Sequence, residues 1–516
     1  MDSKDERHMR VKRMQRFSVQ CFFHKLPYGT FRSHSIHITN RIMRTLLPRI
    51  AVLMAIPIFA QSQVQFDRFF HDRTMRIDVF HSGTKQNESF ALDRVYREGG
   101  WPGSTVNLLD TLNLGEYMAR VFDSKTGLLI YSRGYSAVFN EWQTTDEANQ
   151  GAMKTISESV RIPFPRRSIT FSILRRDKFQ IYRDQFSITI DPNDPTRVCT
   201  ETRNAPGEIV PLMMHGDPHK KVDILILGDG YTSADVDKFK EDAKHFNDVM
   251  FSTSPFKERK NDFNVRALCV PSEQSGIDIP DRNEWKTTAF GTMYNTFGSA
   301  RYVLTEANRE LRNAASAAPY DFITILINDS RYGGGGIYQL YTTTYTIEKT
   351  KGQEWQRDYV YVHEFGHAFA GLGDEYYSSS TGYNDFYPEG IEPWEPNVTR
   401  LLHAPAVKWQ EFVNSGMSVP TDWGKHAYDS LGALLGKLDR LAEDYYTKRE
   451  PIRTSQQGIL KNSALLGKVG AFEGAGYVSS GMYRPSLDCR MFSLSLVDFD
   501  PVCNAAIQRQ IDFYSR

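Results

Sequence analysis

Apolar residues follow two different patterns along the chain, and the change between them divides it into two parts. Between residues 66 and 196, short apolar or alternating runs are separated by clusters of Gly, Asn, Asp and Pro. Runs of this kind are typical of antiparallel strands and predict an all-β sandwich. They read MRIDVF (75–80), YMARVF (117–122), LLIY (128–131), SITFSIL (168–174) and QFSITI (185–190).

After residue 210, compact apolar runs alternate with segments of helical periodicity, which predicts an α/β domain. The helix expected at 234–250 takes Ser233 as its N-cap. One face of it carries Phe239, Ala243, Phe246 and Met250. The other expected elements are strands at 222–227, 263–270 and 322–328 and a helix at 299–314.

Four consecutive glycines at 333–336 precede a β-rich run. Glycine permits backbone conformations that side chains forbid and leaves room for another chain to approach. We expect an edge strand there, on which an extended peptide is held by main-chain hydrogen bonds. A flexible glycine hairpin is the alternative. The candidate substrate-binding residues are Gly335, Gly336, Ile337 and Tyr338.

The segment YVYVHEFGHAFAGLGDE (359–375) carries the strongest chemical signal in the chain. Helical periodicity extends over about residues 353–370. In a helix, His363 and His367 lie one turn apart on one face, the spacing that places two imidazole nitrogens on a single Zn²⁺. Glu364 then lies beside the metal, where its carboxylate accepts a proton from metal-bound water. An amphipathic helix that carries two histidines by chance is the alternative.

A catalytic zinc needs a third protein ligand and an open fourth position. Asp374 follows the helix-ending Gly371 and Gly373, so the chain is placed to turn back and present this carboxylate. Glu375 is an alternative next to it. Other schemes take the ligand from a downstream helix, but prolines interrupt the stretch that holds Glu389, Glu392 and Glu395.

The first 60 residues differ from the rest. Residues 1–42 are basic and aperiodic, and an apolar stretch at 50–60 ends in a small residue. This pattern predicts a secretory signal cleaved after Ala60, with translation starting at Met43. A membrane anchor is the alternative, although ten or so apolar residues are short for a span. We therefore expect export to the periplasm, the cell surface or the medium, and no membrane span in the mature chain.

Length and charge set further bounds. A chain of 516 residues is too long to fold around a single hydrophobic core. We expect a leader at 1–60, a sandwich domain at 61–198 and a catalytic domain at 199–516. The 62 basic residues balance 62 acidic ones, which disfavours nucleic acid as a partner. A leucine stripe predicts a core-facing helix at 430–446 inside a helical insertion at about 425–465, with a lid as the alternative.

Four of the five cysteines lie in the expected mature chain. In an oxidising compartment they form two disulfides, with Cys489 to Cys503 the most local pairing, or stay as buried thiols. The cysteines lack the C-x2-C spacing of zinc knuckles, so we do not expect them to bind zinc. Asp498 and Asp500 match no calcium loop and are expected to be surface carboxylates. The remaining two cysteines are Cys199 and Cys269.

Several segments together resemble the IgA peptidase family of secreted zinc metalloendopeptidases. They are ILILGDGYT, YGGGGIY, HEFGHAFAGLGDEYY, FEGAGY and MYRPSLDCRM, and they extend over nearly all of the mature chain. The resemblance implies an all-β N-terminal domain followed by a metzincin-like α/β catalytic domain. It implies that His363, His367 and Asp374 bind one catalytic Zn²⁺, with Glu364 as the general base and acid.

The resemblance also implies a methionine-bearing turn under the metal. We favour Met491 over Met482 for it. The chain departs from the metzincin pattern H-E-x-x-H-x-x-G-x-x-H, because Gly371 comes one residue late and Asp374 replaces a histidine. Tyr483 or Tyr477 is expected to help hold the oxyanion or merely to pack.

These observations predict a secreted zinc endopeptidase that hydrolyses extracellular protein or glycoprotein. One alternative is a secreted adhesin that binds glycan or protein and whose zinc is structural. Another is a zinc amidase acting on peptidoglycan. Specificity depends on loops that the sequence does not resolve.

Overall fold

The computed structural model describes residues 64–200, 205–377, 386–401, 407–438 and 444–516. The contacts within the chain separate residues 1–61 from residues 62–516, and the account below concerns the second unit. The predicted leader and signal peptide lie outside the described residues. None of the described helices has the length and apolar character needed to cross a membrane.

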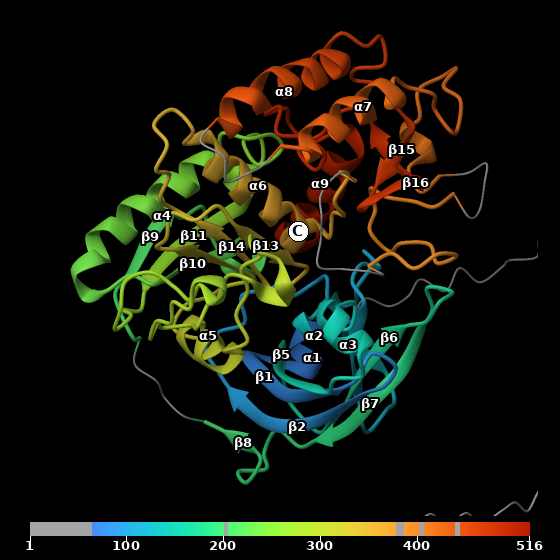
Figure 1. Ribbon diagram of the computed structural model, residues 1–516. Coiled ribbons are helices and arrows are strands. Elements are labelled where there is room, and N and C mark those ends of the chain that lie inside the picture. Colours follow the sequence, from blue (N-terminus) through green and yellow to red (C-terminus); the bar gives the residue numbers. More distant parts are fainter. Residues whose placement is uncertain (1–63, 201–204, 378–385, 402–406, 439–443) are drawn as a thin grey trace, which may run out of the picture. The chain divides into compact units, whose positions relative to one another are not determined.

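Two four-stranded sheets form the N-terminal region (Figure 1). Their neighbouring strands are antiparallel except for β2 and β8. Side chains of both sheets enter one core, in which Ile77 of the first sheet and Phe171 of the second are fully buried. The predicted β-rich region is confirmed. The strand orders are β5-β1-β2-β8 and β4-β3-β6-β7, with bounds β1 Phe70–Gly83, β2 Glu88–Arg97, β3 Tyr117–Asp123, β4 Leu129–Tyr135, β5 Lys154–Pro165, β6 Ile169–Arg176, β7 Tyr182–Ile190 and β8 Val198–Cys199.

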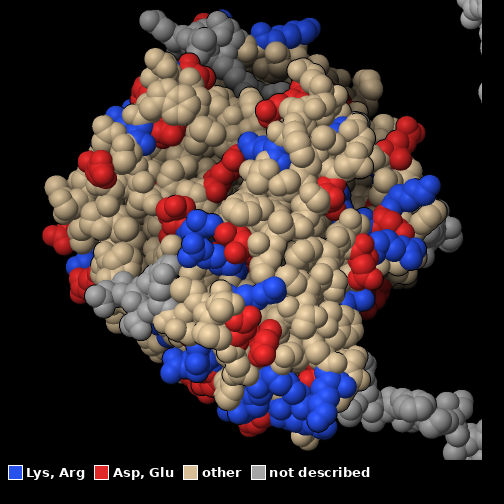
Figure 2. Space-filling view, turned by 90° about the horizontal axis from the view of Figure 1, so that it is seen from below, with Lys and Arg blue, Asp and Glu red and all other residues tan. Residues whose placement is uncertain are grey.

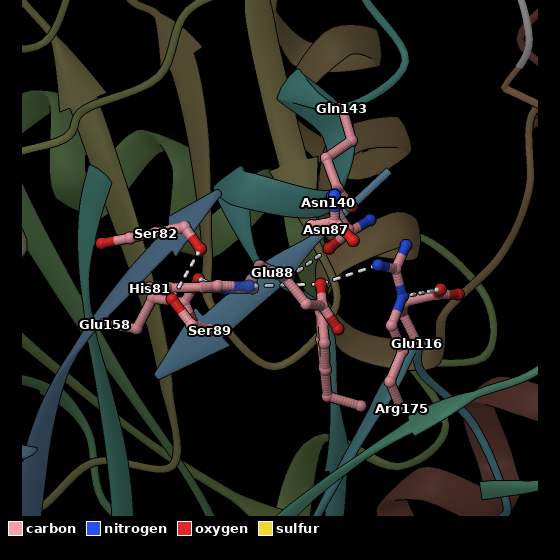
Figure 3. A network of polar contacts seen from close by, with 12 residues as sticks. His81, Ser82, Asn87, Glu88, Ser89, Glu116, Asn140, Gln143, Glu158 and Arg175 are labelled. Carbon is pink, nitrogen blue, oxygen red and sulfur yellow. Dashed lines mark hydrogen bonds and ion pairs between the residues drawn. The ribbon is translucent and has the colours of Figure 1, made fainter. Parts of the chain in front are cut away.

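A buried histidine joins the strands of the first sheet (Figure 3). His81 Nδ1 lies 2.8 Å from Glu158 Oε1, and Nε2 lies 3.3 Å from Glu88 Oε2. Arg175 donates to the same Glu88 oxygen at 2.7 Å. Because both imidazole nitrogens face carboxylates, the network favours the doubly protonated ring. The ring is stacked between those of Phe90 and Phe139.

The network predicts that the stability of this region depends on pH. Burial lowers the pKa of His81, but Glu158 and Glu88 outweigh burial and raise it above the usual 6.5. The stabilisation is therefore complete below about pH 6.5 and is lost as pH rises through the raised pKa. Breaking a buried pair costs on the order of 3–5 kcal/mol, so we expect His81→Gln to lower the melting temperature most at pH 6.

Melting curves of wild type and His81→Gln between pH 6 and 9 check this expectation. The difference between the two melting temperatures should shrink as pH rises. His426→Gln, in which an exposed histidine takes the same substitution, is the control and should leave the melting temperature unchanged. If the melting temperatures of wild type and His81→Gln differ by the same amount at every pH, His81 is not charged in the folded protein.

A six-stranded sheet forms the centre of the following α/β region, in the order β13-β14-β12-β10-β11-β9. The four inner strands are parallel, and the two outer strands are antiparallel to their neighbours. The strands predicted at 222–227, 263–270 and 322–328 are confirmed to within two residues. The bounds are β9 Ile209–Met213, β10 Val222–Asp229, β11 Phe263–Cys269, β12 Phe322–Ile327, β13 Gly334–Ile337 and β14 Tyr341–Tyr345.

Both faces of this sheet are covered (Figure 1). Ile224 and Ile226 pack against helices α4, α6 and α9, whereas Leu225 and Leu227 pack against α5 and against α2 of the N-terminal region. The covering of both faces explains why β10 is buried throughout. The N-terminal region therefore shares a core with the sheet. The bounds are α2 Val138–Trp142, α4 Val236–Met250, α5 Asn308–Ala315, α6 Trp355–Ala370 and α9 Pro501–Ser515.

Two helix starts differ from the prediction. The helix expected at 299–314 begins only at Asn308, because the residues before it pair with the glycine-rich strand β13. Gly334 N–H donates to Arg301 O, and Val303 N–H donates to Gly334 O, each at 3.1 Å. Helix α4 begins at Val236, after a 3-10 turn at Ser233–Asp235 that is capped by Thr232 instead of Ser233. Its hydroxyl and N–H both bond Asp235.

The leucine stripe does not face the core. The chain forms two helices, α7 (Lys425–Gly436) and α8 (Tyr445–Lys461), instead of one helix at 430–446. Both lie within the predicted helical insertion. The described part of α7 has no buried residue, and Leu434 is 48% exposed. The prediction was wrong because α7 packs mainly on α8, and Tyr428, not the leucines, packs against the main core. Leu431, Leu435 and Leu438 are half-buried, and Leu441 lies outside the described residues.

The molecular face in Figure 2 carries basic and acidic side chains interspersed with uncharged ones. This mixture follows the balanced charge of the sequence. No single sign of charge dominates this view.

Candidate active site

Helix α6 lies close to the sheet because of glycines in β13. A Cβ atom on Gly336 would lie 2.1 Å from the carbonyl oxygen of Glu364, and one on Gly334 would lie 2.8 Å from a Val360 methyl group. Any larger residue at these two positions would push the helix away. The glycine run does form a hairpin with β14, and it is required for close packing. The helix ends at Gly371, whose φ of 62° suits glycine.

The two histidines of α6 are held by backbone carbonyls. His363 Nδ1 lies 3.1 Å from Arg490 O, and His367 Nδ1 lies 2.5 Å from Leu372 O. A carbonyl oxygen only accepts hydrogen bonds, so each Nδ1 carries the hydrogen. When the ring is neutral, each Nε2 therefore offers a lone pair, and the two Nε2 atoms lie 3.2 Å apart. Outer partners of this kind fix the orientation of metal-binding histidines.

Asp374 meets these two nitrogens. Its Oδ1 lies 3.0 Å from His363 Nε2 and 3.3 Å from His367 Nε2. This oxygen is buried, and among the described residues the two ring nitrogens are its polar neighbours. Ligands about 2.0–2.1 Å from a tetrahedral zinc lie roughly 3.3 Å from one another. The three side chains, which form one candidate metal group, therefore fit a zinc ion without rearrangement.

Charge interactions in the group are strong. Burial opposes ionisation of Asp374, but the histidines, above all His367, hold its pKa well below the usual 3.8. Burial likewise lowers the pKa of His367, and Asp374 more than reverses this and raises it to about 9. Both shifts express one attraction between a carboxylate and positive charge, and a bound cation would displace the proton.

Glu364 is partly exposed beside this group. Burial raises its pKa above the usual 4.5, while His363 and His367 oppose the rise. A carboxylate with a raised pKa exchanges protons more readily near neutral pH, as a general base and acid must. Its side chain also lies against β13, since a Cβ atom on Gly334 would lie 3.2 Å from Glu364 Cγ.

Met491 lies directly beneath α6. Its sulfur would lie 3.2 Å from a Cβ atom on Gly366, and its carbonyl oxygen accepts the N–H of Glu375 at 2.9 Å. The preceding carbonyl, of Arg490, is the one that orients His363. Met482 instead belongs to a separate small cluster with Val398 and Ala475. The geometry therefore favours Met491 for the predicted turn.

The structure separates the two candidate tyrosines. Tyr483 packs beside the cluster of Trp409 and Val469, and its backbone pairs with Thr399, in agreement with the packing alternative. Tyr477, the weighed alternative, donates its hydroxyl hydrogen to Asp374 Oδ2.

Tyr376 also belongs to this site and was missed. Its ring stacks on His363 with centroids 6.1 Å apart, and Arg301 donates to its hydroxyl at 3.2 Å. The signal available in the sequence was its position two residues after Asp374.

The alternative third ligands point elsewhere. Glu375 accepts from Asn397 at 2.9 Å and contacts Cys503. Glu392 accepts from Thr399 and from the Arg400 N–H. Tyr387 donates to Glu395 at 3.2 Å, and Glu389 is exposed.

The predicted edge strand is open over only part of its length. Gly335 and Ile337 direct their backbone groups toward β14, and Tyr338 O accepts the N–H of Ser136 at 3.0 Å. Gly336 directs its N–H and C=O outward, like Gly334. In the described part of the chain no backbone group bonds to this outer side of Gly336. A peptide could therefore pair with Gly336, beside the histidines.

Two family profiles match the chain. The family profile described as IgA Peptidase M64 matches residues 210–511, more than half of the chain. The profile described as Peptidase M64 N-terminus matches residues 65–187. A search of curated proteins gave no match.

Proposed function

Because the chain belongs to the IgA peptidase M64 family of peptidases, we propose that it is a secreted zinc endopeptidase with a metzincin-like catalytic domain. Its substrates are extracellular proteins or glycoproteins. Export rests on the predicted signal peptide in the first 60 residues.

One observation carries the proposal. Two Nε2 atoms and one buried carboxylate oxygen converge within 3.3 Å of one another. Their donor set is typical of a catalytic zinc with an open position. When bound, the ion supplies a Lewis acid that polarises the scissile carbonyl and lowers the pKa of water.

The residues of the chain have separate roles in this proposal. His363, His367 and Asp374 hold the metal. Glu364 takes a proton from the attacking water and passes it to the nitrogen of the leaving amine. Gly336 pairs with the backbone of the substrate beside this carboxylate.

Around these groups, Tyr477 fixes Asp374 by its hydrogen bond. The Arg490 carbonyl fixes His363. Met491 supports α6 from below. These contacts hold His363, His367 and Asp374 in a single arrangement, which a hydrolytic site requires.

A digestion panel tests the proposal. We expect the purified protein to cleave internal peptide bonds in a mixture of extracellular glycoproteins, to stop when a zinc chelator is added, and to recover with added Zn²⁺. Release of peptides from peptidoglycan, with intact proteins left uncut, would contradict the endopeptidase assignment. Binding of glycoproteins without any cleavage would contradict it as well.

A further inference from the structure

A second group of metal-binding side chains lies below the first. Glu375, Cys489, Asp500 and Cys503 are all buried, and one ligand atom from each lies within 4.8 Å of the others. They come from three segments: the loop after α6, the Met491 turn and the first turn of α9. The group is closed to solvent on all four side chains.

The two carboxylates each keep one oxygen unused. Glu375 Oε1 accepts from Asn397 at 2.9 Å and from the Cys503 thiol at 3.2 Å. Asp500 Oδ1 caps α9 by accepting the N–H groups of Val502 and Cys503 at 2.7 and 2.9 Å. Glu375 Oε2 and Asp500 Oδ2 are buried, and among the described residues only members of this group interact with them. Buried carboxylate oxygens without a partner are costly, and a cation is a common remedy.

The sulfur atoms are arranged like thiolate ligands. Cys489 Sγ accepts backbone N–H groups from Met491 at 3.5 Å and from Asp500 at 3.4 Å. The two sulfurs lie 3.8 Å apart, far beyond a disulfide bond of about 2.05 Å. Two sulfurs each about 2.3 Å from a tetrahedral zinc lie about 3.8 Å apart. The observed separation therefore fits two sulfurs that share one ion.

Among the described residues, no Lys or Arg side chain donates a hydrogen bond to this group. Arg484, whose charge acts on Glu375, directs its donors to the carbonyl groups of Glu473, Gly474 and Leu487. The four ligands therefore face one another around a space that a divalent cation would neutralise.

We propose that Glu375, Cys489, Asp500 and Cys503 bind a second, structural Zn²⁺. Two thiolates and two carboxylates complete a tetrahedral set and leave no open position, as in structural zinc sites. Softer thiolate ligands favour zinc over calcium or magnesium. Binding displaces the thiol protons and joins the three segments by bonds that persist in the folded protein.

The second ion would lie next to two parts of the first site. Glu375 follows Asp374, and Cys489 lies two residues before Met491. The ion would thus fix the floor of the first site from beneath. This inference does not depend on what the first site catalyses.

Sequence alone pointed away from this site. The expected absence of cysteine zinc ligands rested on missing C-x2-C spacing, but here the ligands come from segments up to 128 residues apart. Asp500, expected at the surface, is 5% exposed because it caps a buried helix. Asp498 is exposed as expected.

Metal counting on purified variants tests the proposal. We expect two zinc ions per wild-type chain, one in Cys503→Ser, one in His367→Ala and none in the double variant. Cys199→Ser, at a half-buried cysteine outside the group, is the control and should keep two. Because His367→Ala reports the first site by itself, failure of either proposal is seen separately.

A thiol reagent tests the same site without a mutation, should Cys503→Ser fail to fold. Titrating the wild-type protein with an organomercurial should release one zinc ion per chain as Cys489 and Cys503 react. Release of no zinc would overturn the proposal. So would a single zinc ion in the wild type that Cys503→Ser retains, or a Cys489–Cys503 disulfide found by peptide mapping without reduction.

Discussion

Replacing Glu364 by glutamine is expected to lower kcat at least about a hundredfold while the zinc content stays unchanged. Glutamine has nearly the same shape but neither accepts the proton of the attacking water nor returns it to the leaving amine. The side chain is not among the three groups that converge on the metal position, so metal binding should survive. Steady-state kinetics on a cleaved peptide, together with metal analysis, measures both quantities.

Glu354→Gln provides the matched control. It makes the same chemical change at the exposed residue just before α6, and kcat should stay within twofold or so of wild type, as for a surface substitution. Unchanged turnover in Glu364→Gln would remove Glu364 from the proton transfer.

Replacing Asp374 by alanine is expected to abolish activity and to remove one zinc ion per chain. Loss of an outer partner of a metal ligand already weakens binding roughly 10–100-fold, and a direct ligand should contribute more. The two histidines that remain would hold the ion in an incomplete set. Zinc content after dialysis against a chelator measures the loss.

Glu389→Ala serves as the comparison for this experiment, because that carboxylate is exposed and was one of the alternative ligands. It should keep full zinc content and activity. Full zinc content in Asp374→Ala would mean that the third ligand lies elsewhere.

The parts of the fold that the sequence predicted best are those with local causes. The strand at β10 is an uninterrupted apolar run, and α6 has a helical period and a glycine stop, so neighbours in sequence were enough. The start of α5 was missed because residues near Arg301 pair with Gly334, a contact that periodicity does not encode. The exposure of Leu434 was missed because its stripe has helical spacing although α7 packs mainly on α8.

In the candidate site, too, the residues with local causes were predicted and those held by distant contacts were not. His363, Glu364 and His367 follow from the one-turn spacing of a helix, and Asp374 follows from the glycines that end it. Tyr477 reaches Asp374 from 103 residues away. The carbonyl that holds His363 lies 127 residues away. Such contacts depend on how β15 (Val469–Ala475), β16 (Val478–Ser486) and the Met491 turn fold back, which no local pattern reports.

The central claim is that water is added across a peptide bond at the site of His363, His367 and Asp374. Digestion of mixed extracellular proteins in water enriched in oxygen-18, followed by mass spectrometry of the new C-termini, tests it most directly. Wild type should place the heavy oxygen in new internal C-termini, and Glu364→Gln should produce almost none. Equal labelling by both proteins, or no new termini with zinc-loaded wild type, would contradict the account.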